Sequence, residues 1–369
     1  MNTIDYEAAL AEQPRFFLGA NAGSGFYNGF AAVYDPLQGE HLFILKGGPG
    51  TGKSTFMKRT AAAVLQQGEP CELCYCSSDP RSLDGVRFPT LGAAIVDGTA
   101  PHVTEAKYLG VSERIVNVGD CLDMAAVEAE RETLLPLYEQ NAKLHKRAGR
   151  FIAAASQLLD DSFTADCEGC QMEKAEELAR RLCRTLLPVQ KSQGRQAKRF
   201  LSAVTPEGGV VFEDTVYNLA EQIIVIDDEF GAAASVMLAV VRQWALDAGY
   251  ESYVCPCAVS PERKIDHVIV PGRRLAFCTA NSLLAFDREP TRRIRAGRFR
   301  DNTVFAQHKQ RMRFNKRAAA ELLEGAHNYL AQARQVHDQI EAFYVAAMDF
   351  DRLEDMRRQT TERILSRTL

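Results

Sequence analysis

The residues best suited to chemistry lie in one glycine-rich run near residue 50. The run fits the pattern G-x-x-x-x-G-K-[ST] at every position and reads Gly47, Gly48, Pro49, Gly50, Thr51, Gly52, Lys53, Ser54 and Thr55. Apolar residues 41–45 lead into it as an expected strand, and residues 56–65 follow as an expected helix. Glycines let backbone N–H groups turn inward and a helix N-terminus attracts anions, so this order predicts a phosphate-binding loop. The alternative is a glycine-rich turn that carries a lysine by chance.

This pattern, the Walker A motif, predicts that the chain binds a nucleoside triphosphate together with a magnesium ion. Lys53 would contact the β- and γ-phosphates and act in catalysis, and the Ser54 hydroxyl would hold Mg²⁺. The nine residues of the run form the expected nucleotide site. ATP and Mg²⁺ are therefore the expected cofactors.

A triphosphatase also needs a carboxylate beside the metal. Asp97 is the best candidate, because it follows apolar residues 93–96 and would lie at the C-terminal tip of a buried strand, where doubly wound sheets bind ligands. There it would serve both catalysis and metal binding. The alternative is an acid that only caps a turn. Asp79 and Asp84 are further candidates for substrate contact or for a base, and His102 for sensing phosphate or capping a turn.

The chain repeats itself once. Residues 15–18, 42–45 and 74–76 recur in the same order as residues 198–201, 223–226 and 255–257. The offset between matches stays close to 181 positions, which separate Cys74 from Cys255. Several ordered matches at a nearly constant offset indicate a tandem duplication.

Each copy is expected to form an α/β domain of the P-loop NTPase-like kind, with a parallel-sheet core. A long helical stretch follows in each copy, over residues 122–187 and 303–365, with breaks predicted near Pro136 and at residues 168–169. We expect these stretches to be helical hairpins that pack on the sheets or project from them. A polar linker near residue 188 divides the chain into domains 1–188 and 189–369.

The second copy has lost the chemistry of its glycine loop. The repeat places Asp228 at the position of Gly47, Glu229 at that of Gly48, Ala233 at that of Gly52 and Ala234 at that of Lys53. Acidic side chains would repel a triphosphate, and they would instead satisfy the free N–H groups at the start of the following helix. The second site is therefore predicted to be a pseudo-site. The alternatives are an acidic metal-binding loop, or a Walker B pair at the end of an apolar strand.

A basic stretch, residues 287–317, stands out in a chain of net charge −4. Its acidic residues are Asp287, Glu289 and Asp301, and its eleven basic ones are Arg288, Arg292, Arg293, Arg295, Arg298, Arg300, Lys309, Arg311, Arg313, Lys316 and Arg317. Three interpretations remain open. The stretch is a solvated face, or it supplies an arginine to the γ-phosphate at the first loop, or it binds an acidic partner such as nucleic acid or a protein.

Composition bounds the remaining possibilities. A chain of 369 residues suits two domains, and its 46% hydrophobic and 25% charged residues are typical of globular proteins. The N-terminus shows no signal peptide, no apolar run is long enough for a membrane span, and ten irregularly spaced cysteines favour a cytoplasmic protein. Cys167 and Cys170 form a lone C-x-x-C, which lacks the second pair that a zinc ribbon needs.

The motif order resembles a known family. Residues 44–54, 76–79, 82–85 and 96–102 are similar to those of a bacterial family of tandem P-loop proteins, usually described only as ATP-binding proteins or ATPases. The resemblance covers nearly the whole chain and implies ATP binding, but no known substrate or pathway. Members of the family can keep a lysine in both loops, whereas this chain departs from the pattern at Asp228, Glu229 and Ala234.

Two functions follow as alternatives. In the first, the intact copy hydrolyses ATP slowly with Mg²⁺, and the two copies act as a nucleotide-driven switch on a partner. In the second, the protein is a nucleotide or small-molecule kinase, because the loop also resembles that of nucleoside-monophosphate kinases. A kinase should carry a second-substrate pocket and an arginine-bearing lid. We favour the switch.

Overall fold

The computed structural model describes residues 6–100, 103–286 and 288–369. His102 and Asp287 lie outside the described residues. The first half contains α1 (Tyr6–Ala11), β1 (Arg15–Phe17), β2 (Gly19–Ala22), β3 (Gly25–Asn28), β4 (His41–Lys46), α2 (Lys53–Leu65), β5 (Glu72–Cys76), β6 (Asp79–Phe88), β7 (Ala93–Asp97), β8 (Glu113–Asn117), α3 (Met124–Ala129), α4 (Arg131–Glu168) and α5 (Met172–Leu186). Short 3-10 helices occur between these elements, at Phe30–Ala32, Pro36–Gln38 and Val118–Cys121.

The second half repeats the order of the strands, of the helix after the fourth strand and of the two C-terminal helices. It contains β9 (Arg195–Lys198), β10 (Ser202–Thr205), β11 (Gly208–Val211), α6 (Glu213–Leu219), β12 (Gln222–Asp227), α7 (Ala232–Asp247), β13 (Glu251–Pro256), β14 (Ile265–Val270), β15 (Leu275–Ala280), β16 (Arg292–Arg295), α8 (Asn302–Ala346) and α9 (Phe350–Leu365). Its 3-10 helices are Pro271–Arg273 and Ala296–Phe299.

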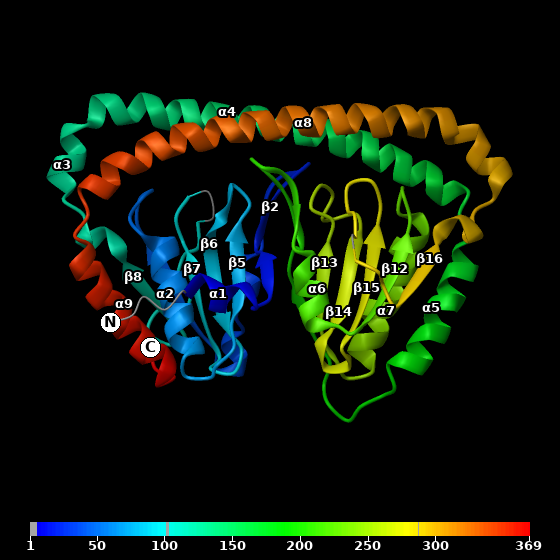
Figure 1. The fold of residues 1–369 in the computed structure, drawn as a ribbon, viewed down its shortest axis with the longest axis horizontal. Coiled ribbons are helices and arrows are strands. Elements are labelled where there is room, and N and C mark those ends of the chain that lie inside the picture. The colour runs from blue at the N-terminus through cyan, green and yellow to red at the C-terminus, as the bar shows by residue number, and fades with distance from the viewer. Residues whose placement is uncertain (1–5, 101–102, 287) are drawn as a thin grey trace.

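The chain forms two six-stranded, mostly parallel sheets that lie side by side (Figure 1). The first has the order β1-β5-β6-β7-β4-β8, and the second has the equivalent order β9-β13-β14-β15-β12-β16. In each sheet a single strand, β6 or β14, runs antiparallel to its neighbours. The registers also agree, since Arg15 lies opposite Leu73 and Lys198 lies opposite Val254. This common topology is the one expected of a tandem α/β duplication.

Strand β4 is buried on both faces, which explains its continuous apolar sequence. Phe43 and Leu45 pack toward α2, whereas Leu42 and Ile44 belong to the core on the other face of the sheet. Its C-terminal end is therefore fixed on both sides where the glycine loop begins.

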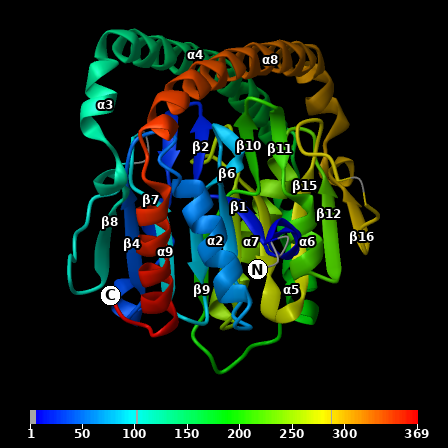
Figure 2. The ribbon, with the colours of Figure 1, turned by 60° about the vertical axis from the view of Figure 1, so that its left-hand side comes forward.

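The helical arms differ from the expected hairpins, because each arm crosses to the other copy. Helices α4 and α8 lie side by side and run in opposite directions above both sheets (Figure 1). Beyond them, α5 of the first copy packs against α7 of the second, and α9 of the second packs against α2 of the first (Figure 2). Apolar faces at helical spacing predict helices correctly, but they do not say which surface covers them.

The predicted break at Pro136 is wrong, whereas the one after Glu168 is confirmed. Pro136 lies inside α4, and the break falls at Glu130, between α3 and α4. An internal proline costs a helix about 3 kcal/mol. Here Leu134 and Leu144, on either side of it, are buried against α8, and this packing offsets the cost. Although α8 extends over 45 residues, no helix in the described part of the chain is both long and apolar enough to cross a membrane.

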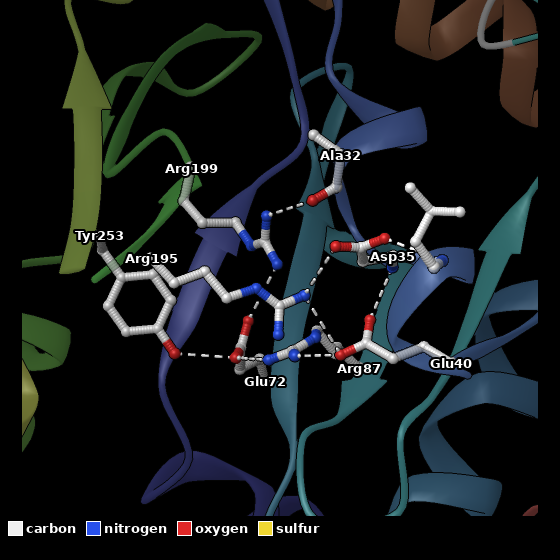
Figure 3. A network of polar contacts seen from close by, with 9 residues as sticks. Ala32, Asp35, Glu40, Glu72, Arg87, Arg195, Arg199 and Tyr253 are labelled. Carbon is white, nitrogen blue, oxygen red and sulfur yellow. Dashed lines mark hydrogen bonds and ion pairs between the residues drawn. The ribbon is translucent and has the colours of Figure 1, made fainter. Parts of the chain in front are cut away.

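A buried polar network joins the two copies (Figure 3). Arg199 of the second copy, 1% exposed, lies 3.3 Å from Glu72 on β5 of the first. Glu72 also accepts a bond from Tyr253 at 2.7 Å and pairs with Arg87 at 2.9 Å. Burial alone would raise the pKa of Glu72, but the charges of Arg199 and Arg87 hold it below its ordinary value. Such a network needs every partner in place, so it fixes how the copies dock.

Candidate functional site

The first glycine loop, residues 47–52, connects β4 to α2 in a conformation that requires glycine. Gly50 has φ 67° and Gly52, the N-cap of α2, has φ 81°. Both angles are left-handed, where residues with a Cβ are disfavoured. The Thr51 hydroxyl closes the loop by donating to the Gly48 carbonyl at 2.8 Å. The loop thus presents the start of α2 to the space above the sheet.

Lys53 is held by the loop itself. Its ammonium group donates to the carbonyl oxygens of Gly47 at 2.9 Å and Gly48 at 2.7 Å, and it lies 3.6 Å from the Asp97 carboxylate. Its side chain is 11% exposed. Oxygen atoms therefore surround a mostly buried ammonium group at the N-terminus of a helix, where an incoming oxyanion would be favoured.

Asp97 caps a turn, which is one of the two roles that the sequence left open, and it also faces the loop lysine. One of its carboxylate oxygens accepts bonds from the N–H and hydroxyl of Thr99, so it does cap a turn. The other oxygen faces Lys53. In the second copy Thr279 takes the equivalent place, because it lies opposite Ile226 as Asp97 lies opposite Leu45.

Asp84 and Asp79 join the same polar cluster. The Leu83 N–H donates to the Ser54 hydroxyl at 2.9 Å, which brings β6 against the start of α2. Burial, with the neighbouring Asp97 carboxylate, raises the pKa of Asp84 well above its usual range. The sequence candidates Lys53, Ser54, Asp97 and Asp84 thus converge.

A cavity of about 960 Å³ opens above this loop, between the sheet edge and the two long helices. This volume lies at the upper end of the range for small-molecule sites. One wall is the loop with Asp79, Asp84 and Asp97. The opposite wall comes from α4 and α8, through Tyr138, Asn141, His145, Arg334, His337 and Glu341.

Helices from the second half also touch the loop directly. A methyl group on Gly48 would lie 2.5 Å from the Tyr344 ring, and one on Gly50 would lie 2.7 Å from the Glu341 carbonyl oxygen. At Gly52 it would meet Leu353 at 2.8 Å. The loop therefore cannot change shape without moving the end of α8 or the start of α9.

The alignment of the second loop requires a correction. Gly231, with φ 98°, is the N-cap of α7 and so occupies the position of Gly52, in place of Ala233. Ala232, not Ala234, therefore stands where Lys53 stands in the first copy. The second loop is two residues shorter than constant spacing implies, since six residues separate β4 from α2 and four separate β12 from α7.

Carboxylates fill the start of α7, as the acidic sequence predicted. Asp228, 1% exposed, accepts bonds from the N–H groups of Gly231 at 3.1 Å and Ala234 at 2.9 Å. Asp166, at the end of α4, accepts from the Ala232 N–H at 3.3 Å. These bonds use the same helix-terminal donors that would otherwise bind an anion.

Two cavities adjoin the second loop, and both are smaller than the first cavity. One measures about 460 Å³ and is lined by Asp228 and Arg293. The other measures about 160 Å³, and Phe163 of α4 and Phe230 of the loop contribute to its walls. Lys264, whose side chain is 19% exposed, lies 3.5 Å from the buried Asp266, and Asp266 occupies the strand position equivalent to Asp84. The second copy thus keeps the arrangement of strand, loop and helix, but carboxylates accept the N–H groups at the start of its helix.

The basic stretch lies at the second copy, away from the first loop. Strand β16 is the outer edge of the second sheet (Figure 1), and none of its arginines lines the described walls of the first cavity. Arg293 pairs with Asp227 at 2.6 Å, Arg300 with Asp166 at 3.0 Å and Lys316 with Glu229 at 2.9 Å. The interpretation of Arg292, Arg293 or Arg295 as a donor to the first loop is therefore wrong. These cations neutralise acidic groups at and beside the second loop, including Asp166 from the first copy.

The arginine that does line the first cavity is Arg334, which the sequence analysis did not single out. Its neighbours His337, Asp338 and Glu341 form the one group of three potential metal-ligating side chains, among the described residues, whose ligand atoms all lie within 4.8 Å of one another. Cys167 and Cys170 are free thiols at the end of α4, and burial raises the pKa of Cys170 to about 12.

Comparison with known proteins finds no matching family model, no matching curated protein and no matching solved structure.

Proposed function

We propose that the first glycine loop binds ATP with Mg²⁺ and that the protein is a slow ATPase with one active site and one pseudo-site. The observation that carries the proposal is the contrast between the loops. In the first, Lys53 lies between two loop carbonyls and Asp97 beneath a large cavity. In the second, Asp228 and Asp166 occupy the helix terminus. Phosphates would replace the carbonyls around Lys53, while Ser54 and Asp97 would hold the metal ion.

The contacts of the loop support a role as a nucleotide-driven switch. Gly48 and Gly50 touch α8, and Gly52 touches α9. To admit phosphate, the loop must release Lys53 from its carbonyls, and the packing on Tyr344 and Glu341 must adjust. Helix α8 reaches from the first loop to the pseudo-site, where Lys316 pairs with Glu229 of the second loop. Nucleotide binding in one copy would thereby shift the arm relative to the other.

A kinase remains the second candidate, and the size of the cavity favours it. Beyond the loop, the cavity extends along α4 past Asn141, His145 and Lys146. This leaves room for an acceptor molecule beside the nucleotide. Burial and the nearby His337 lower the pKa of His145, so it would be neutral and able to accept a proton near pH 7.

The two candidates differ in whether ADP forms without an acceptor. ADP formation is measured with ATP and Mg²⁺ alone, and then with a panel of nucleotides and metabolites. The switch predicts a slow rate that the panel does not raise, whereas a kinase predicts that one acceptor raises it. Lys53→Ala should abolish ADP formation, and the control Lys316→Ala, which removes a lysine at the pseudo-site, should preserve it. A rate that survives Lys53→Ala contradicts both candidates.

A further inference from the structure

The second half of the chain contributes an arginine to the first cavity. Arg334 lies on α8 and is the only arginine among the described residues that line this cavity. Its guanidinium group forms an ion pair with Asp79, at the start of β6, and its side chain is 24% exposed. A half-buried arginine from one copy therefore meets a carboxylate from the other.

Three carboxylates neutralise Arg334 in this arrangement. Besides Asp79, Asp338 lies 2.7 Å from its Nε and Glu341 lies 4.0 Å from the guanidinium group. The last two belong to α8 itself, so only the Asp79 pair ties Arg334 to the sheet. Burial by itself would raise the pKa of Asp79, but bonds from Ser82 and the charge of Arg334 hold it below its ordinary value. The pair is therefore ionised.

Arg334 lies within reach of the loop. The backbone of Glu341 packs on Gly50, and Arg334 is seven residues earlier, about 10 Å along the helix at 1.5 Å per residue. The charges of Lys53, Asp97 and Asp79 all act on the buried Asp84 carboxyl group. The pair of Arg334 and Asp79 thus belongs to the same polar cluster as the loop lysine.

We infer that Arg334 contacts the terminal phosphate during phosphoryl transfer and that Asp79 is its resting partner. The inference rests on the proposed ATP site. The planar guanidinium group stays charged and donates two parallel bonds to phosphate oxygens, which Lys53 cannot do. When Arg334 moves from Asp79 to the phosphate, α8 exchanges its contact with the sheet for one with the nucleotide. Hydrolysis in the first copy is thereby coupled to the arm that spans both.

The step itself balances with water as the only co-reactant. The bond between the γ-phosphorus and the β–γ bridging oxygen breaks, and its electrons remain on ADP. A bond forms between the γ-phosphorus and the water oxygen, and a proton leaves to solvent. Arg334 neutralises the negative charge on the γ-phosphoryl oxygens as these bonds exchange.

The test uses ADP, Mg²⁺ and aluminium fluoride, which together mimic the phosphoryl group in transfer. Such analogues bind about a hundredfold or more tightly than ground-state ligands. Calorimetric titration of the full-length protein should show that aluminium fluoride tightens ADP binding in the wild type but not in Arg334→Ala. Binding of ADP alone should be equal in both. Turnover of ATP by Arg334→Ala should fall about tenfold or more.

Two further variants make the result specific. Arg311→Ala removes an arginine of the same helix that pairs with Asp161 at 3.1 Å near the pseudo-site, and it should respond like the wild type. Arg334→Lys keeps the positive charge but lacks the planar guanidinium group, so it should lose most of the gain in ADP affinity that aluminium fluoride causes. This variant provides the same test if Arg334→Ala does not fold. Equal tightening in the wild type and both Arg334 variants overturns the inference and leaves the ATP site standing. A wild-type protein that binds neither ADP nor ATP overturns the proposed function, and the inference with it.

Discussion

Asp97 divides its two carboxylate oxygens between a turn and the loop lysine. One oxygen orders the turn through Thr99, and the other faces Lys53 at 3.6 Å. A capping role therefore does not exclude a role beside a metal ion, because a fixed turn holds the free oxygen in place. Thr279 at the equivalent position of the second copy offers no charge, in agreement with a pseudo-site.

Replacing Asp97 with asparagine should lower turnover more than ATP binding. The amide can still accept the Thr99 bonds but does not balance the charge of a metal ion. Turnover and ATP affinity are measured for Asp97→Asn and for Thr99→Val, which removes only the hydroxyl bond to the capping oxygen. Thr99→Val should retain most of the turnover. If Asp97→Asn turns over at the wild-type rate, the role passes to Asp79 or Asp84.

Single residues of the site were predictable where a motif fixes the backbone around them. Lys53 and Ser54 follow from the loop, and Asp97 follows because neighbouring parallel strands end at the same edge of a sheet. Arg334 was not predictable in this way. It is one basic residue in a long amphipathic helix, and only the packing of that helix over the other copy brings it to the cavity.

Among the elements, the second loop shows how the protein's own carboxylates can accept the N–H groups at a helix terminus. The Asp228 carboxylate is buried and accepts two backbone N–H groups at the start of α7. Its acidic sequence was enough to predict this role, because carboxylates just before a helix can accept the free N–H groups of its first turn. The shorter loop was not predictable, since an offset estimated from strands does not locate a deletion between them.

Asp228→Ala should lower the free energy of unfolding by about 1–3 kcal/mol, since it leaves two buried donors without partners. Denaturation by urea measures this change. The adjacent Glu229→Ala is the matched control, because Glu229 is exposed and loses only contacts with Lys316 and Ser282. The loss in the free energy of unfolding should be clearly larger for Asp228→Ala than for Glu229→Ala. Equal losses of stability would show that Asp228 does not cap α7.

The stability of α9 should depend on pH through Glu354. Bonds from Arg357 lower the pKa of Glu354 from its ordinary value of 4.5 to about 2, and Arg59 of α2 lies 3.4 Å away. Because the folded pKa is depressed, this stabilisation is present above about pH 5 and is lost as the pH falls toward 2. The free energy of unfolding, measured across this range, should fall less steeply for Glu354→Gln than for the wild type. Identical slopes would contradict this role.

At the scale of the whole molecule, neither copy encloses its cavity alone. The walls of the first cavity include α8, and the second half also supplies α9 against the first loop. The repeat predicted two similar sheets, and apolar periodicity predicted the helices. The exchange of the arms was not predictable, because an amphipathic face packs equally well on either of two related sheets. The network of Glu72 and Arg199 then holds the copies in one relative position (Figure 3).

The number of nucleotide sites per chain tests this account most directly. Isothermal titration of the full-length protein with ATP and Mg²⁺ should give a stoichiometry close to one, because the first loop leads into Lys53, whereas the second loop has no lysine and carboxylates accept the N–H groups of its helix. Lys53→Ala should abolish the binding, whereas Lys316→Ala at the pseudo-site should leave it unchanged. Two sites per chain, or one site that survives Lys53→Ala, would contradict the account.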